Sequence, residues 1–185
     1  MSNVKGSAFA ARIVWVRLHH GEEGVEKVAR HVSPALATLF RGGAVMSRWY
    51  PFEQFIAMNT ALDRLFGAGD LALVKPLARY AADLHLTTIY RLFYKVGTVK
   101  WILARASRLW GMHYDTGMMQ VDSQPGREAT LRIEGFATPH RVHCLSVWGW
   151  AERSVELSGG QSVRSEETAC RSKGDPLCRL RVTWE

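Results

Sequence analysis

The sequence has few of the features that mark membrane-spanning or secreted proteins. Its 185 residues contain no run of about 18 uncharged apolar residues, which is close to the minimum for a membrane-spanning helix. Met1 to Lys5 shows no basic region followed by an apolar stretch, so no signal peptide is recognised and a cytoplasmic location is expected. The three cysteines all lie between Cys144 and the end of the chain, and an odd number without a secretion signal argues against a disulfide framework.

The sequence also lacks the short motifs of common enzyme classes. It has no nucleophile elbow, P-loop, His-Glu-x-x-His pattern or dinucleotide-binding glycine pattern, so we expect no enzyme. The net charge of +7 comes from 24 Lys and Arg residues against 17 Asp and Glu. These basic residues are scattered and nowhere form a run of five, which indicates a solvated basic surface and no nucleic-acid partner.

What is present indicates one globular domain over residues 1–185. Hydrophobic residues make up 47% and charged residues 22%, a balance typical of a folded chain with a substantial core. The periodicity divides the chain into a helical part, about 6–113, and a part of mixed strands and helices, about 114–185.

Several helices are expected in the first part. Ala8 to Leu18 is apolar enough to be helix or strand, whereas Ser33-Pro34 is typical of a helix start, with Ser33 as the N-cap. Pro76 lies inside a predicted helix and should kink or break it. The expected helical segments are Gly24 to Val32, a short helix from Ser33-Pro34, Phe52 to Phe66, Leu71 to Leu84, Thr87 to Val96 and Thr98 to Trp110.

The second part alternates strands with one long helix. Alternating apolar residues predict strands at Met118 to Val121 and Ala129 to Glu134. A helix is expected from Thr138-Pro139 to Gly159-Gly160, with Cys144 on its apolar stripe. The chain should end in a hairpin of Gln161 to Ala169 and Leu177 to Trp184, with a turn at Gly174-Asp175-Pro176.

The C-terminal hairpin carries a constellation of potential metal ligands. Cys170 and Cys178 flank its turn, and Glu167 precedes Cys170 by three residues. If the preceding helix packs on the hairpin, Cys144 joins them, and thiolates are good zinc ligands. Four protein ligands would close the coordination sphere, so the predicted role of zinc is structural. The alternative is three buried free cysteines that pack as small apolar side chains, with Glu167 an ordinary strand-face carboxylate.

Glu167 can share a metal with Cys170 only if the strand is irregular. Residues three apart in a regular strand face opposite sides, so a bulge or strand end near Thr168-Ala169 is required. His143 is an alternative fourth ligand, but it is adjacent to Cys144 on the helix and should point about 100° away.

These residues carry a family resemblance. The run Cys144-Leu-Ser-Val-Trp-Gly149, then Gly159-Gly160, Glu167-Thr-Ala-Cys170, Gly174-Asp-Pro176 and Cys178, resembles the C-terminal half of the 4-vinyl-reductase-type small-molecule-binding domain. Sensory domains of phenol-responsive activators share this pattern, and their three cysteines and glutamate bind structural zinc. Over its whole length the chain also resembles an uncharacterised family expanded in myxobacteria, through Val4-Lys5-Gly6, Trp49-Tyr50-Pro51-Phe52 and the ending Cys170 to Trp184.

The superfamily is similar to TRAPP core subunits and to haem-based nitric-oxide sensors. The resemblance therefore implies an α+β fold with a helical layer on a small antiparallel sheet, often dimeric and sometimes with an apolar pocket. The chain departs from the pattern in two ways. Leu145 replaces the aromatic residue that follows the first cysteine in the phenol sensors, and the Tyr-x-Ser-x-Arg porphyrin clamp of the haem sensors is missing.

Two hypotheses about function follow. The first is a non-catalytic sensor-like domain with an apolar pocket of several hundred Å³. The second is a TRAPP-like adaptor that binds another protein or forms a homodimer through an exposed apolar surface. Gly149 inside a helix also indicates that a neighbouring element, a dimer partner or a ligand approaches it closely. Aromatic residues that could line the pocket, although such residues more often fill a core, are Tyr90, Phe93, Trp101, Trp110 and Trp148.

Overall fold

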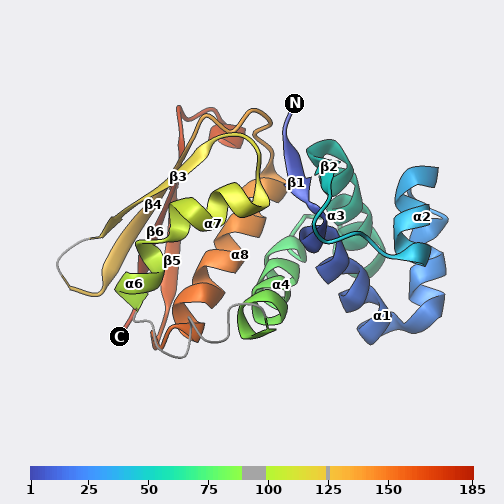
Figure 1. Cartoon of the computed structure of the whole chain (residues 1–185), viewed down its shortest axis with the longest axis horizontal. Coiled ribbons are helices and arrows are strands. Elements are labelled where there is room, and N and C mark those ends of the chain that lie inside the picture. The colour runs from blue at the N-terminus through green and yellow to red at the C-terminus, as the bar shows by residue number, and fades with distance from the viewer. Residues whose placement is uncertain (89–98, 124–125) are drawn as a thin grey trace.

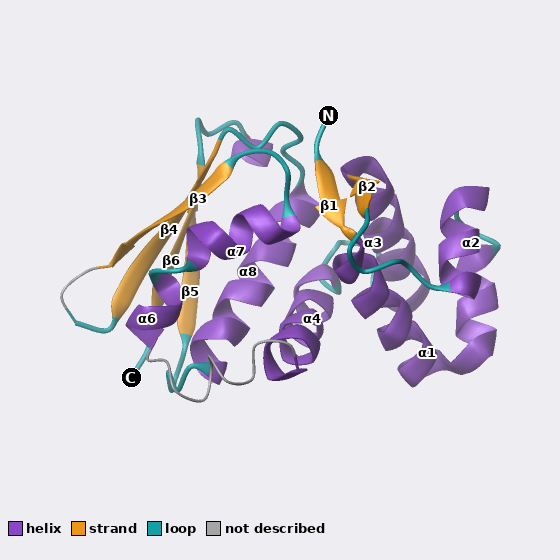
Figure 2. Ribbon diagram, viewed as in Figure 1, coloured by secondary structure: helices purple, strands orange, loops and turns teal. Residues whose placement is uncertain are grey.

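The computed structural model describes residues 1–88, 99–123 and 126–185. It is an α+β fold, as predicted (Figures 1 and 2). A four-stranded antiparallel sheet lies at one end, helices α7 and α8 lie beside it, and α4 leads on to the N-terminal helices at the other end (Figure 1). None of the helices in these ranges is long and apolar enough to cross a membrane.

The N-terminal segment forms a strand that the sequence pattern does not show. Strand β1 (Asn3–Lys5) pairs antiparallel with β2 (Trp49–Pro51), and Val4 also bridges to Tyr114. Strand β2 lies within the part predicted to be helical, about 6–113, so that prediction is wrong there, and β1 precedes that part and was not predicted. Strands of three residues are too short to show a period of two, and their pairing depends on segments far apart in the chain.

Helix α1 (Gly6–Ala29) settles the open choice between helix and strand for Ala8 to Leu18. It changes direction at Gly21, whose φ of 63° lies in the left-handed region that glycine tolerates. Helix α2 (Pro34–Gly42) begins as predicted, because the Ser33 side chain accepts a hydrogen bond from the Leu36 N–H.

The next two helices lie between the N-terminal helices and α8 (Figure 1). Helix α3 (Phe52–Phe66) has the predicted bounds and ends at Gly67. Helix α4 (Val74–Thr88) begins later than expected, because the N–H groups of Leu71 and Leu73 donate to the buried carboxylate of Asp63. Pro76 consequently lies in the first turn of α4, where a missing N–H costs little, so the predicted kink is wrong.

The segment before the sheet is divided differently from the prediction. The helical run expected over Thr98 to Trp110 is two helices, α6 (Val99–Leu103) and α7 (Ala106–His113), separated by a turn. The helix expected over Thr87 to Val96 lies largely outside the described residues.

The C-terminal part follows the predicted order. Strands β3 (Met118–Ser123), β4 (Glu128–Glu134), β6 (Cys178–Thr183) and β5 (Arg164–Ala169) form the sheet in that order, all antiparallel. Helix α8 (Arg141–Leu157) starts three residues after Thr138, since His140 accepts the Val142 N–H and acts as its cap. A short 3₁₀ turn, η1 (Arg171–Lys173), connects β5 with β6.

Helices α4 and α8 form the central helix pair of the molecule. A β-carbon added at Gly149 would lie 2.3 Å from the backbone oxygen of Lys75, so the glycine allows the two helices to touch. The neighbouring element is thus what approaches Gly149. Beside this contact the Glu152 carboxylate of α8 forms ion pairs with two residues of α4, Lys75 at 2.9 Å and Arg79 at 3.3 Å. These ion pairs fix the register of α4 against α8.

Candidate functional site

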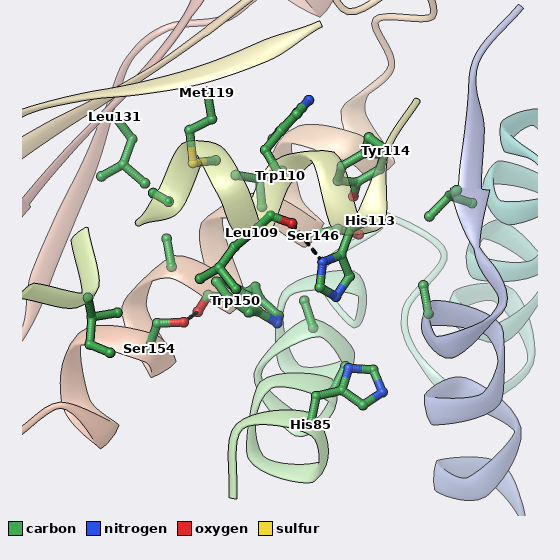
Figure 3. A pocket seen from close by; sticks show the side chains of 18 of the residues that line it. His85, Leu109, Trp110, His113, Tyr114, Met119, Leu131, Ser146, Trp150 and Ser154 are labelled. Carbon is green, nitrogen blue, oxygen red and sulfur yellow. Dashed lines mark hydrogen bonds between the residues drawn. The ribbon is translucent and has the colours of Figure 1, made fainter. Parts of the chain in front are cut away.

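A cavity lies between α4, α7, α8 and the inner face of β3 and β4, and it reaches α1 and α3 (Figure 3). It is open because many of the residues that face it are small. These are Ala78 and Ala81 on α4, Ala106 on α7, and Ser146, Ala151 and Ser154 on α8. Larger apolar side chains close it, among them Phe55, Ile102, Leu103, Leu109, Trp110, Met119, Leu131 and Trp150.

The cavity is smaller than the sequence-based hypothesis requires. The space open to the centre of a water-sized sphere is about 90 Å³, not several hundred. A dry cavity of about 150 Å³ can hold benzene. At about 90 Å³ this cavity is smaller still, which limits its ligand to a small molecule with at most one ring or a short chain.

The predicted pocket aromatics are distributed over several places. Trp110 lies on the cavity wall, whereas Trp148 lines a smaller hollow beside Cys144 and Cys178. Trp101 packs against the guanidinium of Arg105, 3.5 Å from the ring centroid, and is not among the described wall residues. Tyr90 and Phe93 lie outside the described residues.

Two histidines that sequence reasoning did not select lie on the cavity wall (Figure 3). Their ring centroids are 6.3 Å apart. Burial lowers the pKa of His85 to about 4 and also lowers that of His113, so both imidazoles are neutral at pH 7. Within the described part of the chain, two wall atoms, His85 Nε2 and Ser146 Oγ, are buried without a hydrogen-bond partner.

Arg12 and Tyr114 are further wall residues that the sequence analysis left out. Arg12 interrupts the apolar segment Ala8 to Leu18, and this charge within an apolar helix face is the signal that could have identified it. Burial raises the pKa of Tyr114 to about 12, so its phenol keeps its proton.

The three cysteines do converge. Cys144 from α8, Cys170 after β5 and Cys178 at the start of β6 place their sulfur atoms within 4.8 Å of one another. Cys144 Sγ and Cys170 Sγ are 3.1 Å apart, and all three residues are buried. A hydrogen bond to Cys178 and burial raise the pKa of Cys144 far above its ordinary value.

Glu167 lies beside the cysteines, but its carboxylate is paired with two cations. The register of β5 against β6 shifts between Glu167 and Ala169, which is the irregularity that a shared site requires. The carboxylate nevertheless pairs with Arg141 at 2.5 Å and with Lys173 at 2.8 Å. Burial alone would raise the pKa of Glu167, but the hydrogen bonds and charges of Lys173 and Arg141 outweigh it and lower that pKa.

The other candidate ligand, His143, points into an aromatic cluster. Its ring stacks on Phe136 with centroids 3.9 Å apart and meets the edges of Phe52, Trp110 and Tyr114. Burial lowers its pKa to about 3. His143 is therefore a core residue of this aromatic cluster and is not grouped with the three sulfur atoms.

No protein-family model and no curated protein matches the chain. Solved structures match over almost its whole length. An H-NOX protein from S. oneidensis in the Fe(II)NO ligation state aligns with a TM-score of 0.75 and 14% identity, covering 98% of this chain and 99% of that one. An oxygen-binding H-NOX domain related to soluble guanylate cyclases gives 0.71 and 9%, covering 98% and 95%.

A third structure concerns haem redox potential and porphyrin distortion, and it aligns with a TM-score of 0.72 and 9% identity over 97% of this chain and 99% of that one. The chain thus has the fold of the H-NOX proteins, which confirms the predicted nitric-oxide-sensor-like architecture. The specific relation to 4-vinyl-reductase-type or myxobacterial families is not confirmed and stays a prediction.

The comparisons correct the prediction of structural zinc. The similar proteins are described with haem and iron, not with zinc. Arg141 and Lys173 hold the carboxylate of Glu167, and the group of potential ligand atoms within 4.8 Å of one another in the described residues contains the three cysteines without Glu167. The three cysteines alone are weak grounds for a metal site.

Proposed function

We propose that the chain is a non-catalytic sensor-like domain that binds a small apolar molecule in the cavity beside α4, α7 and α8. The observation that carries this proposal is the cavity itself, an apolar space inside a fold shared with H-NOX proteins. The described wall residues include no carboxylate, so no paired acid and base supports catalysis there. The rival TRAPP-like adaptor gains no support from the comparisons, and a homodimer or protein partner stays a prediction.

Haem is the ligand that the fold suggests, but the described wall residues do not fit it. Sites for drug-sized ligands occupy about 300–1,000 Å³, and a porphyrin is at least as large as such ligands. The cavity offers about 90 Å³. Neutral His85 and His113 could ligate iron, but Arg12 is the only cation among the described wall residues, and haem brings two propionates.

We expect that hemin added to the purified protein gives no saturable one-to-one complex. Its Soret band should remain that of free hemin in buffer, and His113→Ala should leave the spectrum unchanged. The measurement is an absorbance titration at micromolar protein. A sharp Soret band that saturates at one equivalent, and that is lost in His113→Ala, would show that the cavity opens to accept the macrocycle.

Toluene tests the cavity directly, since it is neutral and has one ring. At about tenfold its Kd, it should stabilise the wild type by about 1.4 kcal/mol, which raises Tm by about 3–5 °C in a chain of this length. Ala151→Leu places extra carbon atoms in the cavity and should remove this shift. Differential scanning fluorimetry measures the shift in Tm, and calorimetric titration measures the Kd for toluene.

Ala57→Leu is the matched control, because Ala57 is exposed on α3 and does not line the cavity. It should respond to toluene as the wild type does. An equal response of Ala151→Leu and wild type, or no response in either, would contradict binding at this site.

A further inference from the structure

The guanidinium of Arg12 is a buried charge on the cavity wall. Arg12 is 3% exposed, and it lies 5.0 Å from the ring centroid of Phe55. An arginine side chain has five N–H donors. In the described residues the side chain of Arg12 makes one hydrogen bond, from Nε to the amide oxygen of Asn59 at 3.4 Å, and no ion pair with a carboxylate.

Two other well-covered charges in the described residues are paired with cations, and the buried Asp63 carboxylate accepts the N–H groups of Leu71 and Leu73. Glu152 receives Lys75 and Arg79, and Glu167 receives Arg141 and Lys173. Arg12 differs from these groups, since its hydrogen-bond partner in the described residues is a neutral amide that is itself bonded to the Phe55 carbonyl. Among the described residues, the fold therefore leaves a permanent positive charge at an apolar cavity without an ion-paired carboxylate.

Such a charge is costly, because burial disfavours the ionised form. Burial lowers the pKa of Arg12 to about 10, which still leaves it charged at pH 7. A hydrophobic side chain at this position would fold at lower cost. Costly polar groups that the fold does not need are commonly found where a ligand supplies the partner.

We infer that Arg12 receives the carboxylate of a small apolar acid, with one ring or a short chain, that enters this cavity. The inference rests on the proposed function and names the ligand class. A guanidinium can hold both oxygens of a carboxylate. The Tyr114 hydroxyl, protonated at neutral pH, and Ser146 Oγ are further donors on the wall, while the apolar wall residues would cover the rest of the molecule.

Benzoate and toluene provide a matched pair of probes, since they share a ring and differ in the charged group. By calorimetric titration at pH 7.5, the wild type should bind benzoate on the order of tenfold more tightly than toluene. Arg12→Met should lose on the order of tenfold or more in benzoate affinity and keep its toluene affinity within about threefold. Arg12→Lys, which keeps the charge but not the paired donors, should lie between them.

Arg64→Met is the control, because Arg64 is exposed on α3 and does not line the cavity. It should bind both probes as the wild type does. Equal benzoate affinities in wild type and Arg12→Met would overturn the role of Arg12, while toluene binding would leave the proposed function standing. If the wild type binds neither probe, the proposed function itself fails and the inference fails with it.

Discussion

Gly149→Val should be among the most destabilising single substitutions in this protein, lowering the free energy of unfolding by about 3 kcal/mol or more. A β-carbon at this position would lie 2.3 Å from the Lys75 oxygen and 3.2 Å from the Ala78 β-carbon, so α4 and α8 must move apart. The nearest atom belongs to the backbone of α4 and cannot rotate away. Urea denaturation followed by circular dichroism measures the loss.

Gly111→Ala is the matched control, because Gly111 also lies in a helix, α7, but an added β-carbon there meets nothing within 4 Å. Alanine should leave stability unchanged or raise it by up to about 1 kcal/mol through helix propensity. Similar destabilisation by both substitutions would mean that the contact between α4 and α8 is not as close as described.

Gly149 also shows how much of a tertiary contact can be predicted from the sequence. Glycine inside a helix is costly, which indicates a close neighbour from the sequence alone. The choice between a neighbouring helix, a dimer partner and a ligand could not be made, because Lys75 is far away in the chain. Local cost is visible in the sequence, whereas the identity of the contact depends on tertiary packing.

The same distinction between local effects and tertiary contacts explains the errors in the predicted fold. Residues that act locally were interpreted correctly, such as Ser33 as an N-cap and Gly67 as a helix end. Pro76 was misplaced because the start of α4 depends on Asp63, a residue of the preceding helix. The pairing of β1 with β2 joins segments more than 40 residues apart, and nothing in either short segment indicates it.

The features of the site also separate into those that local sequence predicts and those that depend on tertiary contacts. The convergence of Cys144, Cys170 and Cys178 could be predicted, because two flank one turn and the third lies on a helix that packs against it. The pairing of Glu167 with Arg141 could not, because a carboxylate that binds a metal and one that binds a cation have the same sequence spacing. Zinc was predicted from the spacing of the cysteines and Glu167 and then from the family resemblance, and neither shows which group occupies the fold.

Acid should destabilise this protein well above the pH at which its carboxylates titrate. His143 and His85 have pKa values near 3 and 4 in the folded state, against about 6.5 for an unperturbed histidine. Above pH 6.5 both are neutral whether the chain is folded or unfolded, and stability is unaffected. Below pH 6.5 the unfolded chain binds protons that the folded chain does not, so stability falls by about 1.4 kcal/mol per pH unit for each histidine.

Over the interval from pH 6.5 to pH 4.5 the two histidines together should cost on the order of 5 kcal/mol. His143→Phe should remove about half of that loss, because a phenyl ring suits the aromatic cluster and does not titrate. At pH 7 the variant should be at least as stable as the wild type, since His143 Nε2 is buried without a partner in the described part of the chain.

Urea denaturation of both proteins at several pH values between 7.5 and 4.5 measures the difference in slope. His31→Phe serves as control, because His31 is exposed and should leave the slope unchanged. Parallel pH profiles for wild type and His143→Phe would mean that the folded protein accepts a proton at His143 near pH 6.5, which requires water or an acceptor beside that ring. The aromatic cluster around His143 would then be open, and because Trp110 belongs both to that cluster and to the cavity wall, the cavity would be less well enclosed than its lining residues indicate.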